Sequence, residues 1–349
     1  MAISDVHLLQ TWRDVLKLSK LKEGEAVTIL TSSDTNKQNL EAARNAAIDL
    51  GAVVTVLELP PTNGDLALSR DKTAFIGKTA LEGNKAAMAA LKTSDLVIDL
   101  MLLLFSPEQA EILSGGTRML LAVEPPEVLT RLKPTLEDKR RVMAAAARLQ
   151  GAKVMTVTSA AGTSLECALG EFPVLTEYGF ADEPGRWDHW PSGFLATWPN
   201  EKTAQGTIVI DRGDILLPFK TYVQAPITLT VDKGYVRKIE GGFDAEFLKS
   251  YMDSFNDPEV FAISHVGWGL QPRAQWTALG LYDKEATLGM DARAFYGNFL
   301  FSTGPNTEAG GTRDTPCHID IPLRNCSVSL DGEPMTVNGD VVVPDQKAA

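Results

Sequence analysis

The pattern with the clearest chemical meaning lies near the end of this 349-residue chain, at residues 315–322. Alternating apolar residues and prolines predict a strand here, and side chains two positions apart on a strand share one face. His318 and Asp320 should therefore point the same way. An imidazole beside a carboxylate provides two members of the 2-His-1-carboxylate set, which suits Fe(II) with open coordination positions. A surface histidine beside a surface aspartate would give the same pattern, so other residues must decide whether this pair belongs to a metal site.

Three of the four histidines lie in or beside segments rich in aromatic, polar and glycine residues. We expect these segments to be loops on a rigid frame, where binding residues concentrate. Tryptophan and tyrosine next to acids, histidine and arginine suit a flat polar ligand, although the same rings would also fit an ordinary core. The three predicted loops are residues 176–193, 264–273 and 296–311.

His265 lies in the second predicted loop and is the natural second nitrogen ligand beside His318 and Asp320. Gly267 and Gly269 follow it and would let other backbone approach closely. The alternative is an interior histidine that is simply hydrogen-bonded. With His265 included, the sequence predicts a metal site of two histidines and one aspartate.

The first predicted loop holds two candidates for proton chemistry. His189 lies between Asp188 and Trp190, which is typical of a polar group oriented by an acid. We expect it to transfer a proton or to contact a substrate, and not to bind the metal. Glu177 is the second candidate, either for binding the donor groups of a substrate or for carrying protons.

The composition is that of a globular protein, and it argues against some classes of binding partner. With 44% hydrophobic residues, the chain is long enough for two domains with cores of normal size. The net charge of −12 argues against nucleic acid or an anionic membrane as partner, since both reward clustered Lys and Arg. The most apolar run, residues 96–105, is too short to span a bilayer. Three cysteines at no metal-ligand spacing, and no signal-peptide pattern at the start, predict a cytoplasmic protein with free thiols.

The first domain is predicted at residues 1–153. Its strands alternate with amphipathic helices, which predicts a doubly wound α/β domain with a parallel sheet. A phosphate-binding loop is not expected at Gly77, because the glycine that such a loop needs five positions earlier is Lys72. We expect this domain to be a scaffold whose loops lean over a site elsewhere. The main predicted helices are residues 5–21, 36–50, 83–91 and 135–149, and strands begin at residues 26, 53, 96 and 118.

The second domain is predicted at residues 154–349. Short strands separated by turn residues, with one helix at about residues 245–255, predict a mostly antiparallel α+β domain that carries the metal site. The predicted strands include residues 207–211, 215–219, 227–231 and 235–239, followed by a hairpin in residues 328–343.

Four segments of the second domain carry a resemblance to a known family. They are residues 177–194, 263–276 and 295–307, and Pro-Cys-His-Ile-Asp-Ile-Pro-Leu at residues 316–323. Together they resemble the 2,5-dihydroxypyridine 5,6-dioxygenases, ring-opening enzymes of bacterial nicotinate and related pyridine degradation. The resemblance runs along the whole chain and is most specific in the second half. These enzymes are in turn similar to the thermophilic metallo-aminopeptidases, which share the two-domain plan and a terminal His-x-Asp pair.

The resemblance implies a mononuclear iron enzyme that opens a small aromatic N-heterocycle between C5 and C6, with O₂ as co-substrate and N-formylmaleamate as product. Fe(II) is the implied cofactor, and its implied ligands are His265, His318 and Asp320. A homo-oligomer is also implied, with a hexamer as the candidate assembly. The implied substrate contacts are Leu104, Phe105, Glu177, His189 and Ser302, and the catalytic positions among them are Phe105, Glu177 and His189.

One position departs from the family pattern. Members carry a histidine between the leucines and Ser-Pro-Glu-Gln at the end of the third strand, where this chain has Phe105. A group at the carboxyl end of a parallel strand would lean over the site, but a phenyl ring cannot move a proton. Either His189 or Glu177 takes over that role, or the enzyme is impaired and Phe105→His should raise its turnover. An unchanged rate with iron fully loaded would contradict this hypothesis.

A dinuclear hydrolase similar to the metallo-aminopeptidases is the alternative function, and a non-catalytic binding protein is a third. A second metal ion needs further carboxylates beside the first ligands, and Glu177 is the one ready candidate in the sequence. Metal content separates these hypotheses, because a dioxygenase holds a single iron whereas the hydrolase holds two zinc or cobalt ions.

Overall fold

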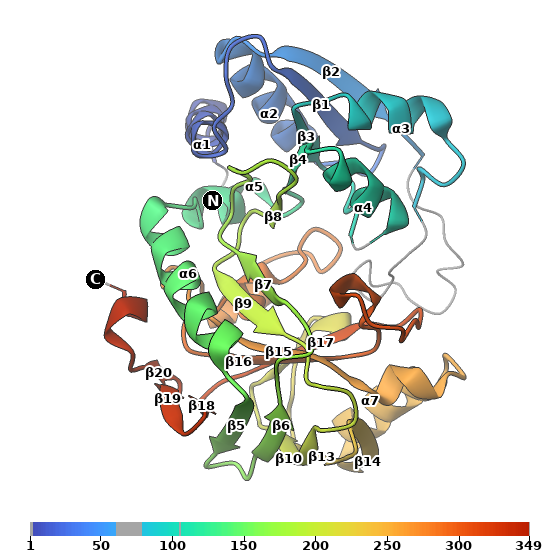
Figure 1. The fold of residues 1–349 in the computed structure, drawn as a ribbon, viewed down its shortest axis with the longest axis vertical. Coiled ribbons are helices and arrows are strands. Elements are labelled where there is room, and N and C mark those ends of the chain that lie inside the picture. The colour runs from blue at the N-terminus through green and yellow to red at the C-terminus, as the bar shows by residue number, and fades with distance from the viewer. Residues whose placement is uncertain (1–2, 61–78, 105, 349) are drawn as a thin grey trace.

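A computed structural model describes residues 3–60, 79–104 and 106–348 of the protein. In Figure 1 a parallel sheet with its helices forms the upper part of the molecule, and antiparallel sheets form the lower part. The strands of the parallel sheet are β1 (Ala26–Thr31), β2 (Val53–Glu58), β3 (Leu96–Asp99), β4 (Arg118–Leu121) and β8 (Trp187–His189). Their spatial order is β2-β1-β3-β4-β8. The last of these strands comes from the second half of the chain, so the two halves share this sheet.

Five of the six helices described within residues 1–153 begin at a capping side chain, and the helix Pro126–Arg131 has none. Each cap accepts a hydrogen bond from a backbone N–H of the first turn, which stabilises a helix by about 1 kcal/mol. The capping residues are Ser4, Asn36, Asn84, Ser106 and Thr135. The helices are α1 (Asp5–Leu18), α2 (Lys37–Asp49), α3 (Lys85–Lys92), α4 (Pro107–Ser114), α5 (Pro126–Arg131) and α6 (Leu136–Gly151).

An eight-stranded antiparallel sheet forms the base of the lower part, with α7 (Phe243–Asp253) packed on β13 and β14. Its strand order is β14-β13-β10-β6-β5-β18-β19-β20. The strands are β5 (Val154–Ser159), β6 (Ser164–Ala168), β10 (Gln205–Ile210), β13 (Ile227–Asp232), β14 (Tyr235–Gly241), β18 (Cys326–Leu330), β19 (Glu333–Val337) and β20 (Asp340–Val341).

A second antiparallel sheet, of five strands, lies between that base and the parallel sheet (Figure 1). Its order is β17-β16-β15-β9-β7. The strands are β7 (Val174–Glu177), β9 (Phe194–Thr197), β15 (Ile263–Gly269), β16 (Phe299–Thr303) and β17 (Ile319–Leu323). Every residue of β15, β16 and β17 is buried. The smaller elements beside it are β11 (Ile215–Leu216), β12 (Thr221–Tyr222) and α8 (Met290–Arg293).

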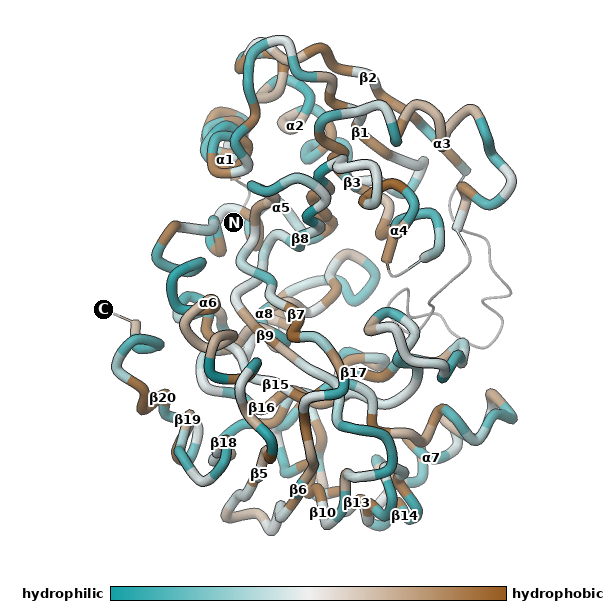
Figure 2. Tube along the Cα trace, in the orientation of Figure 1, coloured by the Kyte–Doolittle hydropathy of each residue, from teal (hydrophilic) through white to brown (hydrophobic). Residues whose placement is uncertain are grey.

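The fold class predicted from the sequence is confirmed: a parallel α/β region is followed by antiparallel, strand-rich sheets. The division into domains at residue 153 stays a prediction. Figure 2 shows hydrophobic segments, drawn brown, along strands of both parts, with hydrophilic teal segments in many of the surface loops. No helix within the described ranges is both long enough and apolar enough to cross a membrane.

Some local predictions were wrong. The strand predicted at residues 315–322 begins only at Ile319. Only Ile215–Leu216 of the strand predicted at residues 215–219 is extended, because Pro218 lies in the short 3-10 helix Leu217–Phe219 and has no N–H to give to a sheet. The segments predicted as loops contain the whole of β8 and β16 and nearly all of β15.

Glycine explains why β15 did not look like a strand in the sequence. A Cβ atom at Gly267 would lie 1.9 Å from the backbone oxygen of Leu195 on the neighbouring strand β9. Only glycine permits this close approach of two backbones. Gly267 is therefore required by the packing of β15 on β9, and Gly269 by the backbone of Phe295, whose oxygen would lie 2.3 Å from a Cβ atom there, although glycines in a sequence usually indicate a turn.

Candidate metal centre

The three predicted metal ligands come together at one end of the five-stranded antiparallel sheet. His265 lies on β15, Asp320 lies on β17, and His318 precedes β17 by one residue. The Nε2 atoms of His265 and His318 lie 3.0 and 3.1 Å from Oδ1 of Asp320. One ligand atom from each residue lies within 4.8 Å of the other two, and all three residues are buried. The structure thus confirms that His318 and Asp320 share a face.

Arg293 on α8 holds the other oxygen of this aspartate, with 2.6 Å between its Nε atom and Asp320 Oδ2. Burial would raise the pKa of Asp320, but Arg293, the charge of His318 and hydrogen bonds from His265 and His318 hold it well below its usual range. Burial would likewise lower the pKa of His318, and the Asp320 carboxylate outweighs burial and raises it. The aspartate is therefore ionised and has its Oδ1 atom turned to the two imidazoles.

These residues fit a metal ion. Two imidazoles and a carboxylate are the donor set that suits a divalent transition metal. Both rings direct Nε2 at the same carboxylate oxygen, while the buried Nδ1 atoms of His265 and His318 have no hydrogen-bond partner among the described residues. A cation among the three donors would take the place of the hydrogen bond between His318 Nε2 and Asp320 Oδ1, because both atoms would then bind the metal.

The three donors open onto a small pocket of about 50 Å³. Its walls are mostly apolar, and Glu177, His189 and Arg293 are its other polar side chains. The apolar lining residues are Leu102, Leu104, Leu175, Trp187, Phe194, Leu288, Met290 and Leu300. Leu104, a predicted substrate contact, is thus at the pocket wall. A flat ring with a few polar substituents matches this lining.

Glu177 reaches the pocket from the end of β7. Burial and the nearby carboxylate of Asp188 raise the pKa of Glu177 well above the usual range. A hydrogen bond from Ser192, whose Oγ lies 3.0 Å from Glu177 Oε2, lowers the pKa but does not outweigh them. The raised pKa favours the protonated form of this side chain. A buried carboxylic acid of this kind can donate a hydrogen bond or a proton inside the pocket.

His189 lies opposite, with 3.9 Å between its Nδ1 atom and Glu177 Oε2. Burial, and then the charge of Arg293, lower its pKa to about 3, so the ring is neutral at pH 7. The prediction that Asp188 orients the imidazole was wrong. Asp188 instead accepts the backbone N–H of His189 and pairs with Arg186. Successive side chains on β8 point to opposite faces of the sheet, so the imidazole of His189 points away from the Asp188 side chain and toward Glu177.

The two remaining predicted site residues differ. Ser302 on β16 is fully buried, and its Oγ accepts the backbone N–H of His265 at 2.9 Å. This bond fixes the strand that carries His265, and contact of Ser302 with a substrate stays a prediction. Phe105 lies outside the described residues, so its predicted role stays a prediction as well.

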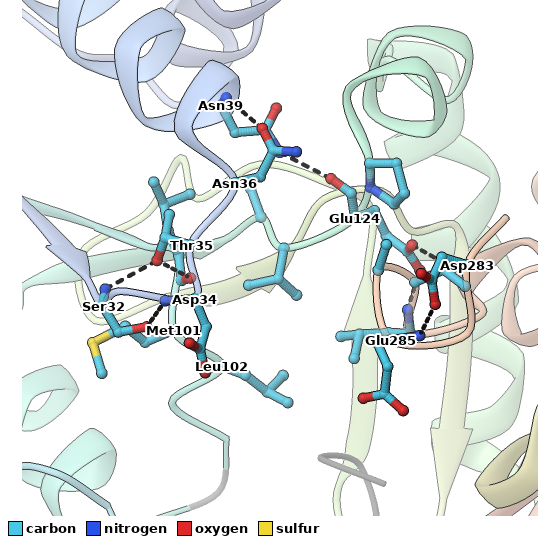
Figure 3. Close-up of a pocket in the computed structure, with 17 residues that line it drawn as sticks. Ser32, Asp34, Thr35, Asn36, Asn39, Met101, Leu102, Glu124, Asp283 and Glu285 are labelled. Atoms are coloured by element: carbon cyan, nitrogen blue, oxygen red, sulfur yellow. Dashed lines mark hydrogen bonds between the residues drawn. The ribbon is translucent and has the colours of Figure 1, made fainter. Parts of the chain in front are cut away.

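A second, larger cavity of about 300 Å³ adjoins this pocket, and Leu102 and Leu288 line both. Figure 3 shows it between the segments that follow β1, β3 and β4 and the segment of Asp283 and Glu285. Its lining includes four acidic residues and no histidine or cysteine among the described residues. Within the same described ranges, the group of side chains close enough to share a metal ion is the one at the smaller pocket.

Comparison with known proteins agrees with this geometry. The family model described as 2,5-dihydroxypyridine 5,6-dioxygenase matches residues 7–343. This chain belongs to that family. A 2,5-dihydroxypyridine 5,6-dioxygenase of Pseudomonas putida is 57% identical to it over 349 residues, which is 100% of both chains.

Solved structures extend the comparison within the dioxygenase family and beyond it. The structure of the Pseudomonas putida KT2440 dioxygenase matches with a TM-score of 0.97 and 57% identity, covering 99% of each chain. Wild-type AmpT from Thermus thermophilus matches with a TM-score of 0.64 over 97% of this chain and 99% of its own, at 14% identity. At that identity the second match shows a shared fold alone.

Arg293 is the main pocket residue of this dioxygenase-family chain that its sequence did not reveal. It lies on a helix of four residues, which is too short for a periodic pattern, and it reaches Asp320 across 27 positions. Trp187 and Phe194 also line the pocket; Trp187 lies within the aromatic segment 177–194 that the sequence singled out, and Phe194 is its last residue. The aromatic composition of this segment therefore indicated Trp187 and Phe194 as pocket residues. No local sequence pattern indicated Arg293.

Proposed function

We propose that this protein opens the ring of 2,5-dihydroxypyridine with O₂ between C5 and C6 and yields N-formylmaleamate. Both oxygen atoms enter the product as the C5–C6 bond breaks, so no external reductant is needed. The observation that carries this proposal is the convergence of His265, His318 and Asp320 in a buried, mostly apolar pocket. The 57% identity to a 2,5-dihydroxypyridine 5,6-dioxygenase over the full length supports it.

The proposed cofactor is Fe(II), held by His265, His318 and Asp320. Fe(II) bound there would supply the open coordination positions at which the ring and O₂ meet. Arg293 fixes the carboxylate of Asp320 through its Oδ2 atom, which leaves Oδ1 for the metal side. The apolar walls orient the ring and keep water from the reacting atoms.

Glu177 and His189 would handle the protons of the substrate. The raised pKa of Glu177 favours its protonated form, which can donate a hydrogen bond, while neutral His189 can accept a proton. The buried Nε2 atom of His189 has no hydrogen-bond partner within the described residues, so it is available to a bound ring. Since Phe105 cannot transfer a proton, these two groups are our candidates for the acid and base roles, with Leu104 and Ser302 as further substrate contacts.

A dinuclear hydrolase is not favoured. Among the described residues, the potential metal-binding group has three members, and a second ion would need further carboxylates beside them. We further propose a homo-oligomer, with a hexamer as the candidate assembly, that acts in the cytoplasm. The buried thiols of Cys167 and Cys326 suit that reducing compartment.

The test is a single-turnover experiment. Iron-loaded protein is mixed with 2,5-dihydroxypyridine without oxygen and then aerated, while the ring absorbance and the product mass are followed. We expect the absorbance to disappear only after aeration, with a product mass equal to substrate plus one O₂. The metal-free protein is the control. If neither the wild type nor Phe105→His consumes the ring with iron fully loaded, the proposed activity is wrong.

A further inference from the structure

The side chain of Glu124 connects the parallel-sheet part to the metal centre. It follows β4 at the carboxyl edge of the parallel sheet and is fully buried. Figure 3 shows it reaching across to the segment that holds Asp283 and Glu285, where dashed lines mark its hydrogen bonds. That segment belongs to the second half of the chain and leads directly into α8.

Both carboxylate oxygens of Glu124 are used by this segment. Oε2 accepts the hydroxyl of Thr287 at 2.6 Å, and Oε1 accepts the backbone N–H groups of Leu288 at 3.1 Å and Met290 at 2.9 Å. The Thr287 hydroxyl in turn accepts the N–H of Gly289 at 3.1 Å. One carboxylate therefore fixes the backbone of four consecutive residues.

The same segment holds Arg293. The Arg293 guanidinium donates from Nη1 to the backbone oxygen of Leu288 and from Nε to Asp320 Oδ2. Leu288 thus connects Glu124 to Arg293, because its N–H donates to Glu124 and its carbonyl accepts from Arg293. A shift of this segment would move the guanidinium and with it the Asp320 carboxylate.

We infer that Glu124 is a positioning residue for the metal centre, acting through Leu288 and Arg293 on Asp320. The inference rests on the proposed role of Asp320 as a metal ligand. Removing an outer partner of a metal ligand commonly weakens metal binding by about 10–100-fold, because the ligand loses its fixed orientation. Glu124 would thus make the parallel-sheet part contribute to metal affinity although it holds none of the three ligands.

A second connection should keep α8 folded when Glu124 is changed. Arg131 on α5 forms a two-pronged pair with Asp291 on α8, with both N–O distances 2.7 Å. This pair holds the helix without touching Leu288 or Arg293. A Glu124 variant should therefore lose the precise placement of Arg293 while the chain still folds.

The test uses Co(II), whose visible absorption reports the geometry of its ligands. Metal-free full-length protein is titrated with Co(II), and thermal unfolding is recorded for each variant. Glu124→Ala should raise the Kd about 10–100-fold and change the visible bands. Glu124→Gln should restore most of the affinity, because its amide oxygen still accepts the N–H groups of Leu288 and Met290.

Glu25→Ala is the matched control. Glu25 pairs with Arg118 at 2.6 Å at the amino end of β4, whereas Glu124 follows the carboxyl end of that strand. This control should lower thermal stability and leave the Kd and bands unchanged. If Glu124→Ala does not fold, Thr287→Val removes one donor and should raise the Kd by a smaller factor.

The possible outcomes separate this inference from the proposed function. Wild-type protein that binds no Co(II) would overturn the metal centre and the inference together. Normal binding by the wild type, with Kd and bands unchanged in Glu124→Ala or, failing that, in Thr287→Val, would overturn the inference alone. A Kd raised equally in Glu25→Ala would also overturn it, since the effect would then be general destabilisation.

Discussion

The two cavities at the centre of this protein differ in size and chemistry. The larger one, about 300 Å³, lies at the carboxyl edge of the parallel sheet, and about half of the residues that line it are polar or acidic. The smaller one, about 50 Å³, lies on the five-stranded antiparallel sheet, is mostly apolar and holds the His-His-Asp set. They adjoin at Leu102 and Leu288.

The comparison shows that volume is a poor guide to the reacting site. Ligands of open α/β sheets usually bind outside the carboxyl ends of the strands, which would favour the larger cavity. Its acidic side chains come from separate segments, however, and within the described ranges they form no group close enough to share a metal ion. In the smaller pocket, buried strands bring three donors together, and rigid elements hold such geometry more accurately than loops do.

The largest expected effect separates the two cavities directly. Asp320→Ala removes one of the three donors and the partner of Arg293, so turnover should fall on the order of 10³-fold or more and bound iron should be lost. Asp34→Asn, at the wall of the larger cavity, should leave both unchanged. Turnover with matched iron analysis measures this difference. Equal losses in the two variants would remove the distinction between the cavities.

A smaller loss is expected when the proton chemistry of the apolar pocket is changed but its metal is kept. Glu177→Gln should lower turnover by about 10²-fold with normal iron content. Because its pKa is raised well above the usual range, wild-type Glu177 keeps its proton to higher pH than an ordinary carboxyl group does. Wild-type turnover should therefore fall as the pH rises through that pKa, and the variant should lack this fall. A variant with the wild-type rate and pH profile would show that Glu177 has no such role.

The outer support of the metal set should have an intermediate effect. Arg293→Lys keeps the charge but cannot reach Asp320 Oδ2 and Leu288 together, so metal affinity should fall about 10–100-fold. Arg118→Lys, a change of another buried arginine at the amino end of β4, should not alter that affinity. Metal titration of both variants makes the comparison. A weaker metal site in both would indicate a general loss of structure.

The smallest effect concerns stability. Native His189 takes up a proton only near its pKa of about 3, whereas the unfolded chain does so below about 6.5, so native stability falls as the pH drops between these values. At pH 5 this amounts to about 2 kcal/mol. His189→Gln should therefore lose about 2 kcal/mol less than the wild type between pH 7 and pH 5. Denaturant unfolding at both pH values measures this, and identical losses would show that the native ring titrates normally.

Local patterns in the sequence were enough for the fold class and for the meeting of His265, His318 and Asp320. Alternation along a strand placed His318 and Asp320 on one face, and alternating strands and helices indicated the parallel sheet. Strand β15 was missed because Gly267, which its close packing on β9 requires, looks like a turn residue in a sequence.

Local sequence patterns could not predict contacts between segments that are far apart in the chain. Strand β8 joins the parallel sheet from the second half of the chain, which no local periodicity indicates. Glu124 and Arg293 act through contacts with residues 163 and 27 positions away. A glutamate after a strand and an arginine in a four-residue helix have no spacing that distinguishes them from ordinary surface charges.

The location of the iron tests the central claim most directly. Anomalous diffraction at the iron absorption edge, from crystals of the iron-loaded protein, would show where the metal binds. We expect a single strong peak between His265, His318 and Asp320. A peak at the acidic wall of the larger cavity, or no peak in protein that turns over substrate, would contradict the account.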